Sequence, residues 1–290
     1  SDGKKIAYVR GRGTLVVADI SADGKLSNEK ILNESWASPN GIVWSPDNKW
    51  LAYSIEDLYF NEEVFIQAAD NSSKPVNISM HPRGDNNPFW SADGSKLGFI
   101  SERSVGRSAD VWFVWLKKED WEKEAQDWQE NELPAESETA KSKEKKDKTP
   151  KPIKIDFDKI YERVVQVTNF PGNENDLVIS KNGETFYYTT SSSNANGRDL
   201  FSIKWDGKDL KEITKGGANP NAVTMDKEGK YLYYTKQGSL GRIDTKTSTT
   251  ENLPFVSKMK VDYVAERTQV FEEAWRTIRD GFYDPNFHGN

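Results

Sequence analysis

The stretch NGIVWSPDNKWLAYS, residues 40–54, places a polar turn between two short apolar runs, which is the pattern of a β-hairpin. The stretch NNPFWSADGSKLGFI, residues 86–100, has the same layout 46 residues later. Five residue types recur without a gap between the two stretches, namely those of Asn40, Trp44, Ser45, Asp47 and Leu51. A phrase that repeats at a fixed spacing indicates a repeat architecture, so the first question is whether it occurs elsewhere.

Three further copies of the phrase are present. Asp2–Tyr8 matches Asp47–Tyr53 at an offset of 45, Ser180–Tyr188 matches Ser91–Phe99 at an offset of 89, and Asp226–Tyr234 follows 46 residues later. The period is therefore about 45 residues, with one interval of double length.

Each unit reads as four short strands. An apolar strand, an Asp/Asn-Gly type turn and a second strand ending in an aromatic residue are followed by a loop, a third strand and a short closing segment. The expected third strands are Leu15–Ile20, Val64–Ala68, Val111–Leu116, Leu200–Trp205 and Leu240–Ile243. Four strands in units of roughly 40 to 45 residues predict an all-β fold, a β-propeller of four-stranded blades with about five blades visible.

Large aromatic residues recur at equivalent points of the units. Because one sheet cannot bury both of its faces alone, blades stack and cover one another. We therefore expect the recurring aromatics to fill the space between blades rather than to form a binding surface; they are Trp44, Tyr53, Trp90, Phe99, Phe186 and Tyr188.

Composition restricts the class of protein further. The net charge of −6 and the charged fraction of 30% give no basic footprint for nucleic acid, and no apolar run is long enough to span a membrane. Cysteine is absent, which excludes disulfides and thiolate metal sites. The first unit opens inside a repeat turn at Ser1–Gly3, so we expect its opening strand and the natural N-terminus to lie outside this sequence, with the ring truncated there.

The double-length interval coincides with a highly charged tract. Between Lys117 and Lys151, 20 of the 35 residues are Asp, Glu, Lys or Arg, which is too polar to form a core. We expect an insertion over residues 117–160, between the third and fourth strands of one blade. The start of the insertion, Glu119–Gln129, has helical spacing, and the remainder is expected to be mobile. Ile153–Phe157 is expected to lead the chain back to the blade. We expect the insertion to be a solvent-exposed loop, and a role in docking a partner is the alternative.

The C-terminal segment departs from the strand pattern. Between Thr268 and Phe282, apolar residues at i, i+3, i+4, i+7 and i+11 predict an amphipathic helix, with acidic residues near its start and Arg279 near its end. We expect the blades to occupy residues 1–256, and residues 257–290 to form a linker and the first helix of a following domain.

This segment carries a specific resemblance. The sequence from Phe271 to Gly289, a helix followed by Phe-Tyr-Asp-Pro and His-Gly, resembles the start of the catalytic half of tricorn-type serine peptidases. Residues Lys151–Phe157 and Glu162–Val165 resemble the inserted stretch of the C-terminal propeller in the same family. The blade repeats alone are also similar to TolB-like and prolyl-oligopeptidase-type propellers.

The resemblance implies a multidomain peptidase whose parent protein degrades peptides. It implies that this propeller acts as a substrate filter or conduit, that the catalytic residues lie downstream, and that the protein is a homo-oligomer in the cytoplasm, with a periplasmic location left open. The alternative is a TolB-like, non-enzymatic propeller that binds proteins. Neither reading includes nucleic acid or membrane as a partner, and neither includes a cofactor.

Candidate catalytic residues are few. Serine hydrolysis needs a base, usually histidine, and the chain has His81, in a link between blades, and His288, in the family-like stretch. In the resembling enzymes the catalytic histidine comes further downstream, so that role is not carried onto His288, and a surface turn is the favoured role of His81. No nucleophile elbow, metal-spaced histidine pair or phosphate loop occurs, so no catalytic, cofactor or metal residue is assigned.

Acidic and basic residues near the third strands give two further candidates. Glu63, Asp110 and Asp199 precede the third strands of three blades, and this equivalence favours a shared strand-end hydrogen bond over acid/base catalysis as in a propeller glycosidase. Arginines lie in or beside the loops between second and third strands, where a cationic rim for peptide carboxylates is the alternative to simple solvation. These arginines are Arg10, Arg12, Arg103, Arg107 and Arg198.

Overall fold

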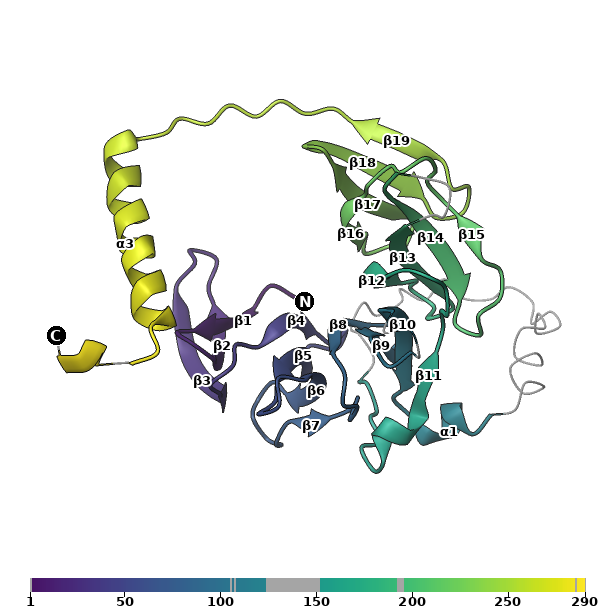
Figure 1. Cartoon of the computed structure of the whole chain (residues 1–290), viewed down its shortest axis with the longest axis horizontal. Coiled ribbons are helices and arrows are strands. Elements are labelled where there is room, and N and C mark those ends of the chain that lie inside the picture. Colours follow the sequence, from purple (N-terminus) through teal and green to yellow (C-terminus); the bar gives the residue numbers. More distant parts are fainter. Residues whose placement is uncertain are drawn as a thin grey trace, which may run out of the picture.

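Five antiparallel sheets follow one another along the chain. The computed structural model describes residues 2–104, 106, 108–123, 152–191, 196–284 and 286–289. Four sheets have four strands and the first has three. The sheets are arranged around an arc like blades, and the first strands of neighbouring four-stranded sheets, β4, β8, β12 and β16, lie side by side (Figure 1). The all-β, propeller-type fold predicted from the repeats is confirmed.

The strands of each sheet are consecutive in sequence, so every sheet is a simple meander. Sheet A contains β1 (Lys5–Arg10), β2 (Thr14–Ile20) and β3 (Leu26–Glu34). Sheet B contains β4 (Asn40–Trp44), β5 (Trp50–Glu56), β6 (Glu62–Ala68) and β7 (Val76–Asn77). Sheet C contains β8 (Asp85–Trp90), β9 (Lys96–Ser101), β10 (Asp110–Trp115) and β11 (Val164–Gln166). Sheet D contains β12 (Asn175–Ile179), β13 (Thr185–Ser191), β14 (Arg198–Lys204) and β15 (Lys211–Glu212), and sheet E contains β16 (Asn221–Met225), β17 (Tyr231–Lys236), β18 (Ser239–Asp244) and β19 (Thr250–Leu253).

The repeated Ser-x-Asp phrase forms the turn between first and second strands. In sheet B the Ser45 hydroxyl accepts the Trp50 N–H at 2.9 Å, and Asn48 adopts a φ of 59°. The same closure recurs in sheet C, where Ser91 accepts the Lys96 N–H at 2.9 Å and Gly94 has a φ of 71°. The turn therefore needs a hydroxyl acceptor and a residue that tolerates the left-handed region, which explains the repeated Ser and Asn/Gly.

Four apolar clusters lie between successive sheets. Tyr53 belongs to the cluster between sheets A and B, Trp90 and Phe99 to the cluster between B and C, and Phe186 and Tyr188 to the cluster between C and D. These five side chains are at most 5% exposed. Trp44 is half-buried against the cluster between A and B. The predicted role of the aromatics as filling between blades is confirmed.

The charged tract lies between β10 and β11 of sheet C. Its described beginning forms a short helix, α1 (Lys118–Trp121), and its described end leads into a 3₁₀ turn, η1 (Ile160–Arg163). Most of the helix expected over Glu119–Gln129 lies outside the described residues, as does most of the tract expected to be mobile. Ile153, Ile155 and Phe157 pack against the cluster between sheets B and C.

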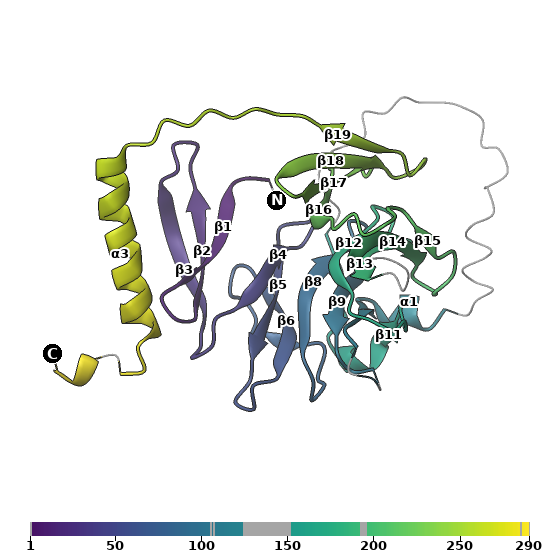
Figure 2. The same cartoon turned by 45° about the horizontal axis from the view of Figure 1, so that its top comes forward.

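A long helix follows sheet E. The extended residues 254–262 cross the open side of the arc, and α3 (Tyr263–Gly281) then runs beside sheet A (Figures 1 and 2). The helix begins five residues before the predicted start because Asp262 caps it, accepting the N–H groups of Val264 and Ala265 at 3.0 and 3.3 Å. A 3₁₀ turn, η2 (Phe287–Gly289), follows.

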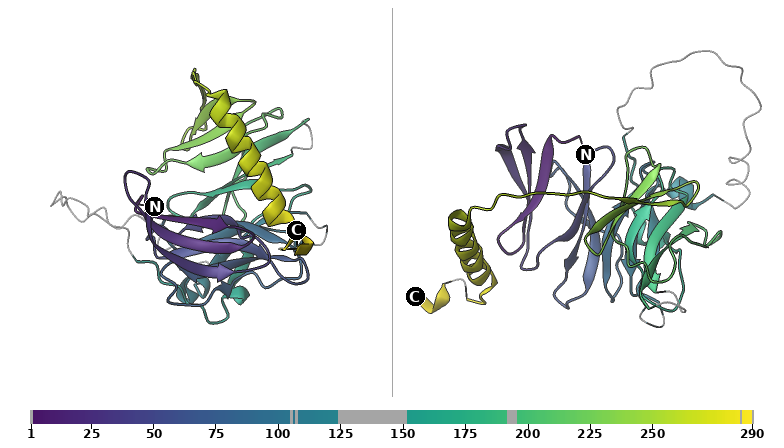
Figure 3. Two further views of the ribbon diagram at one scale, coloured as in Figure 1. Left: turned by 90° about the vertical axis from the view of Figure 1, so that its left-hand side faces the viewer. Right: turned by 90° about the horizontal axis from the view of Figure 1, so that it is seen from above.

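The helix α3 makes little contact with the blades. None of its residues is buried, and Phe271 and Trp275 on its apolar face are 72% and 52% exposed. The right-hand view of Figure 3 shows the helix standing away from the stack of sheets. Among the described residues, no helix has the length and apolar character needed to cross a membrane.

Candidate functional site at the loop end

The two ends of the blades differ in chemistry. At one end, which we call the loop end, loops join the second strands to the third strands, and links join each fourth strand to the next blade. The opposite end, which carries the turns of the Ser-x-Asp phrase, is called the hairpin end. The acidic residues singled out in the sequence, Glu63, Asp110 and Asp199, all lie at the loop end, in the first two residues of β6, β10 and β14.

In sheets B and D these acids fasten the third strand to the chain that leaves the fourth strand. Asp199 accepts the Thr214 hydroxyl at 2.8 Å and the N–H groups of Gly217 and Ala218 at 2.6 and 3.0 Å. The Thr214 hydroxyl in turn accepts the Leu200 N–H at 2.9 Å. The arrangement matches the expected strand-end hydrogen bond.

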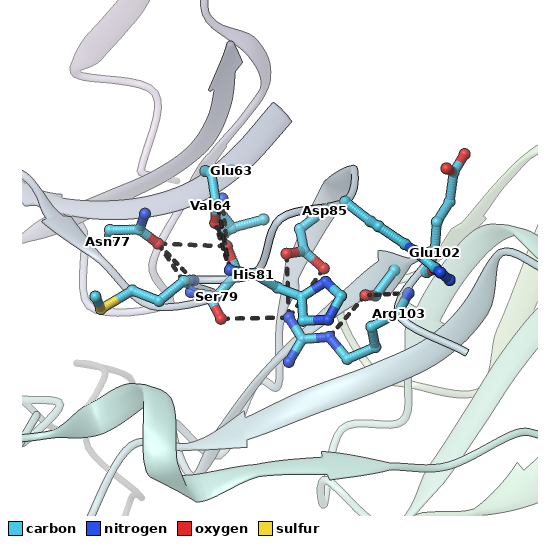
Figure 4. A network of polar contacts seen from close by, with 11 residues as sticks. Glu63, Val64, Asn77, Ser79, His81, Asp85, Glu102 and Arg103 are labelled. Atoms are coloured by element: carbon cyan, nitrogen blue, oxygen red, sulfur yellow. Dashed lines mark hydrogen bonds and ion pairs between the residues drawn. The ribbon is translucent and has the colours of Figure 1, made fainter. Parts of the chain in front are cut away.

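The corresponding contacts in sheet B form a larger network with sheet C (Figure 4). Glu63 accepts the Ser79 hydroxyl and, at 3.1 Å, the backbone N–H of His81. The Ser79 hydroxyl accepts the Val64 N–H at 3.0 Å, and the Ser79 carbonyl accepts from Arg103 at 3.4 Å. Burial raises the pKa of Glu63, and the hydrogen bond from Ser79 opposes that rise.

A buried ion pair forms the sheet C side of this network. Arg103 Nη2 lies 3.0 and 3.1 Å from the two carboxylate oxygens of Asp85, which is fully buried, and Arg103 Nε donates to Ser101 at 2.8 Å. The guanidinium also lies over the rings of Phe99 and Trp112, 5.4 and 5.1 Å from their centroids. Burial raises the pKa of Asp85, and Arg103 opposes that rise. Ionic, hydrogen-bonding and ring contacts thus hold Arg103 in one place.

His81 lies beside Ser79, but the two residues do not form a pair of general base and nucleophile. Ser79 donates to Glu63, and within the described residues no partner is found for the buried His81 Nδ1. Burial lowers the pKa of His81, and the nearby Arg103 lowers it further. A serine nucleophile needs a base to accept its proton, so this geometry supports a structural rather than a hydrolytic role for His81.

The link between sheets C and D has a different arrangement around Asp110. There a second acid, Glu174, lies in the link, and both carboxylates are fully buried. Ser104 and Gln166 donate to Asp110 Oδ2, and Thr168 donates to Glu174 at 3.4 Å. Asp110 Oδ1 and Glu174 Oε1 have no hydrogen-bond partner in the part of the chain that the structure describes. Burial, reinforced by the charge of Asp110, raises the pKa of Glu174 to about 8.

The arginines expected to form a cationic rim are largely committed to other contacts. Arg10 pairs with Glu29 at 2.8 Å, Arg103 is buried with Asp85, and Arg198 donates to Asn221 at 2.8 Å. Arg12 donates to the backbone oxygen of Asp280 near the end of α3. Arg107 lies outside the described residues.

The second histidine lies in an exposed cluster after α3. His288 Nδ1 is 3.1 Å from Asp284 Oδ2, and His288 Nε2 is 2.5 Å from the Tyr283 hydroxyl. Phe282 and Phe287 stack with ring centroids 5.0 Å apart beside it. The Tyr283 and His288 side chains are 72% and 58% exposed, so the cluster lacks the water exclusion that strengthens electrostatic catalysis.

Within the described ranges, no group of three or more His, Asp or Glu side chains is placed to hold an ion.

Some residues of the loop-end networks were not singled out in the sequence. Ser79 and Glu174 lie in links between blades and Asp85 is the first residue of β8, and no repeat phrase marks any of the three. A signal was present for Ser79, because Thr168 and Thr214 occupy the corresponding place after the fourth strand in sheets C and D. Glu174 had no such signal, because in sheets B and D backbone N–H groups, and not a second acid, face the acid of the third strand.

Comparisons with known proteins agree with this architecture. The family of the tricorn protease C1 domain matches residues 263–290. A Tricorn-like protease C-terminal subunit from Sulfurisphaera tokodaii is 25% identical over 305 residues, covering 98% of this chain and 33% of that protein. The chain thus spans about a third of the length of this curated relative.

Solved structures give the same picture for the fold. The crystal structure of the tricorn protease superposes with a TM-score of 0.71 at 14% identity, over 98% of this chain and 28% of that chain. A TolB-type structure from Agrobacterium tumefaciens has a TM-score of 0.59 at 12% identity, over 87% of this chain and 76% of that chain. TolB from Acinetobacter baumannii has a TM-score of 0.57 at 18% identity, over 89% and 55%. The chain is thus similar to tricorn-type proteases in its C-terminal sequence and in its fold, as its sequence predicted, and it shares the propeller fold with TolB.

Proposed function

We propose that this chain is the propeller portion of a tricorn-like serine peptidase that degrades peptides. Residues 1–256 form the blades, and residues 257–290 form the linker and the first helix of the peptidase half. The catalytic residues lie downstream of residue 290, and the blades filter or conduct the peptide substrate. The protein acts as a homo-oligomer.

The observation that carries this proposal is the joining of a propeller to a C1-like helix. Residues 263–290 match the tricorn C1 domain and follow directly on sheet E. The apolar face of α3 is exposed, which suits a helix that packs against a further domain. A propeller that only binds proteins has no need of such a helix.

The loop-end chemistry supports a non-catalytic role for the chain itself. Ser79 and His81 share a network, but the serine hydroxyl donates to Glu63. The acids at the third strands are used to fasten the links between blades. This role leaves hydrolysis to residues outside the chain.

Hydrolysis of fluorogenic peptides tests the proposal. The full-length gene product is expected to cleave short peptides, and the purified chain of 290 residues is expected to be inactive. If the blades act as a filter, the gene product should lose activity as the substrate is lengthened or folded. Activity in the purified chain would contradict the placement of the catalytic residues downstream, whereas no activity in the gene product favours the TolB-like binding propeller as the alternative.

A further inference from the structure

A groove lies between sheets A and B at the hairpin end. Its volume is about 660 Å³. Val17, Ala68 and Ala69 are among the apolar residues that line it, and its charged lining residues are the cations Lys5, Lys30 and Lys49 and the carboxylates Asp19 and Asp70. The loop-end networks described above are at the opposite end of the blades, so the groove belongs to a different site.

The next groove along the stack, between sheets B and C, is filled by the chain itself. Ile153 donates its backbone N–H to Asp47 Oδ2 at 2.8 Å, and its side chain lies against Gly94, where a Cβ atom would come within 2.8 Å of Ile153 Cγ1. The Phe157 ring lies 5.3 Å from that of Trp50, and Ile155 packs on the same cluster. An extended segment with apolar residues at alternate positions therefore fits between two neighbouring turns.

The repeat relates the two grooves. Asn48, Lys49 and Trp50 of sheet B occupy the positions that Gly94, Ser95 and Lys96 occupy in sheet C. The single turn at Ser45–Lys49 thus borders both grooves. On the filled side, Asp47 accepts a backbone N–H from the inserted segment.

The open side presents an unused acceptor at the same turn. Asn48 Oδ1 is buried and has no hydrogen-bond partner among the residues that the structure describes, and Asn48 lines the open groove. A buried acceptor without a partner costs free energy, and a peptide N–H would remove that cost. The geometry of the filled groove shows how a backbone donor reaches this turn.

The charges at the groove indicate the kind of peptide. Lys5 pairs with Asp19 at 2.5 Å, and Lys30 donates to the backbone oxygen of Asp70 at 3.4 Å. Lys49 is exposed and makes no ion pair with any described residue. An acidic side chain beside the apolar positions would meet this free ammonium group and gain affinity and orientation.

We propose that the groove between sheets A and B binds an extended peptide with apolar residues at alternate positions and acidic residues between them. The peptide lies across the hairpin end as Ile153–Phe157 does one blade further on. This site holds a peptide without cleaving it, and the inference does not depend on a peptidase acting downstream.

Binding of a defined probe to the purified 290-residue chain tests the inference. The probe is a fluorescein-labelled heptapeptide with isoleucine, isoleucine and phenylalanine at alternate positions and aspartate at the others, measured by fluorescence anisotropy. Lys49→Glu should weaken binding at least about tenfold, because it reverses the free charge. Lys227→Glu, in the corresponding turn of sheet E, is the matched control and should change affinity less than about twofold.

A second variant removes the acceptor without straining the turn. Asn48→Gly places at this positive-φ position the residue that sheet C has there, and it should weaken binding about 3- to 10-fold, equivalent to one lost hydrogen bond. Equal affinity of Lys49→Glu and Lys227→Glu, or no measurable binding of the probe, overturns the proposal.

The absence of cysteine allows the position of the peptide to be measured directly. Ser72→Cys places a thiol at the edge of the groove, and Ser257→Cys places one in the exposed linker. A bromoacetyl version of the probe should alkylate the first variant much faster than the second, and unlabelled probe should suppress that difference. Equal rates for both variants would show that binding occurs elsewhere and contradict the proposal.

Discussion

The links between sheets B and C and between sheets C and D place an acid at the same point of the repeat but compensate its charge differently. Glu63 has a hydroxyl and a backbone N–H as donors, with the Arg103–Asp85 ion pair beside it. Asp110 faces a second carboxylate, Glu174, whose pKa is raised to about 8 by burial and by Asp110.

The comparison shows that the repeat fixes where an acid is placed but not its protonation state. In the first link, donors and a cation oppose the rise in pKa that burial causes at Glu63 and Asp85. In the second, no described residue forms an ion pair with either carboxylate, and burial together with the charge of Asp110 favours a proton on Glu174. The two links should therefore respond differently to mutation and to pH.

The largest effect is expected from removing the cation of the first link. Arg103→Met leaves the fully buried Asp85 without its partner and should lower the free energy of unfolding by about 3–5 kcal/mol. Urea unfolding measures this loss. Arg198→Met, at the loop end of sheet D where the arginine donates to an asparagine, is the control and should change stability by less than about 0.5 kcal/mol.

Because of the second link, the free energy of unfolding should decrease as the pH rises into the alkaline range. The folded-state pKa of Glu174, about 8, lies above its ordinary value of 4.5, so the folded state binds more protons between these limits. Its contribution is fully present below about pH 4.5 and is lost as pH rises through about 8, which amounts to a few kcal/mol.

Glu174→Gln should remove that dependence. The unfolding free energy of this variant, measured in urea from about pH 5 to pH 9, should fall less steeply than that of the original chain. Glu212→Gln, at an exposed position of β15, serves as control and should leave the slope unchanged. A variant curve parallel to the original would mean that Glu174 is ionised throughout.

A smaller difference in stability is expected between variants that remove the hydroxyl donor to the third-strand acid in sheet B and in sheet D. Ser79→Ala removes a donor from Glu63, which keeps the His81 N–H, whereas Thr214→Ala leaves Asp199 with two backbone donors. We expect Ser79→Ala to cost about 2 kcal/mol and Thr214→Ala about 1 kcal/mol. Thermal unfolding of the two variants compares them, and the reverse order would contradict this reading of the donors.

The smallest effect concerns the hydroxyl beside Glu174. The Thr190 hydroxyl lowers the pKa of Glu174, so Thr190→Val should move the alkaline midpoint of the stability profile upward by less than about one pH unit. Thr235→Val, at an exposed position of β17, is the matched control. A midpoint that stays in place or moves downward would exclude a contact between Thr190 and the ionised carboxylate.

Most of the fold could be predicted from the sequence, but fewer of the contacts at the loop end could. The Ser-x-Asp phrase encodes its own hydrogen bonds, so Ser45 and Ser91 sufficed to predict the hairpins and their period. The role of Glu63 and Asp199 could be predicted because equivalent positions make equivalent contacts. The earlier start of α3 was missed because the cap at Asp262 lies outside the apolar period.

The pairing of Asp110 with Glu174 could not be predicted from spacing. The two residues are separated by the charged insertion, and only the return of the chain to sheet C brings them together. The same return places Ile153 on Asp47, 106 residues away. Such contacts depend on how blades are stacked rather than on any local pattern.

Covalent labelling of the full-length gene product by a fluorophosphonate, followed by mass spectrometry, tests most directly whether this propeller serves a serine peptidase. The account predicts a single adduct on a serine downstream of residue 290 and none on residues 1–290. An adduct on Ser79 or on another serine of this chain, or no adduct at all, would contradict it.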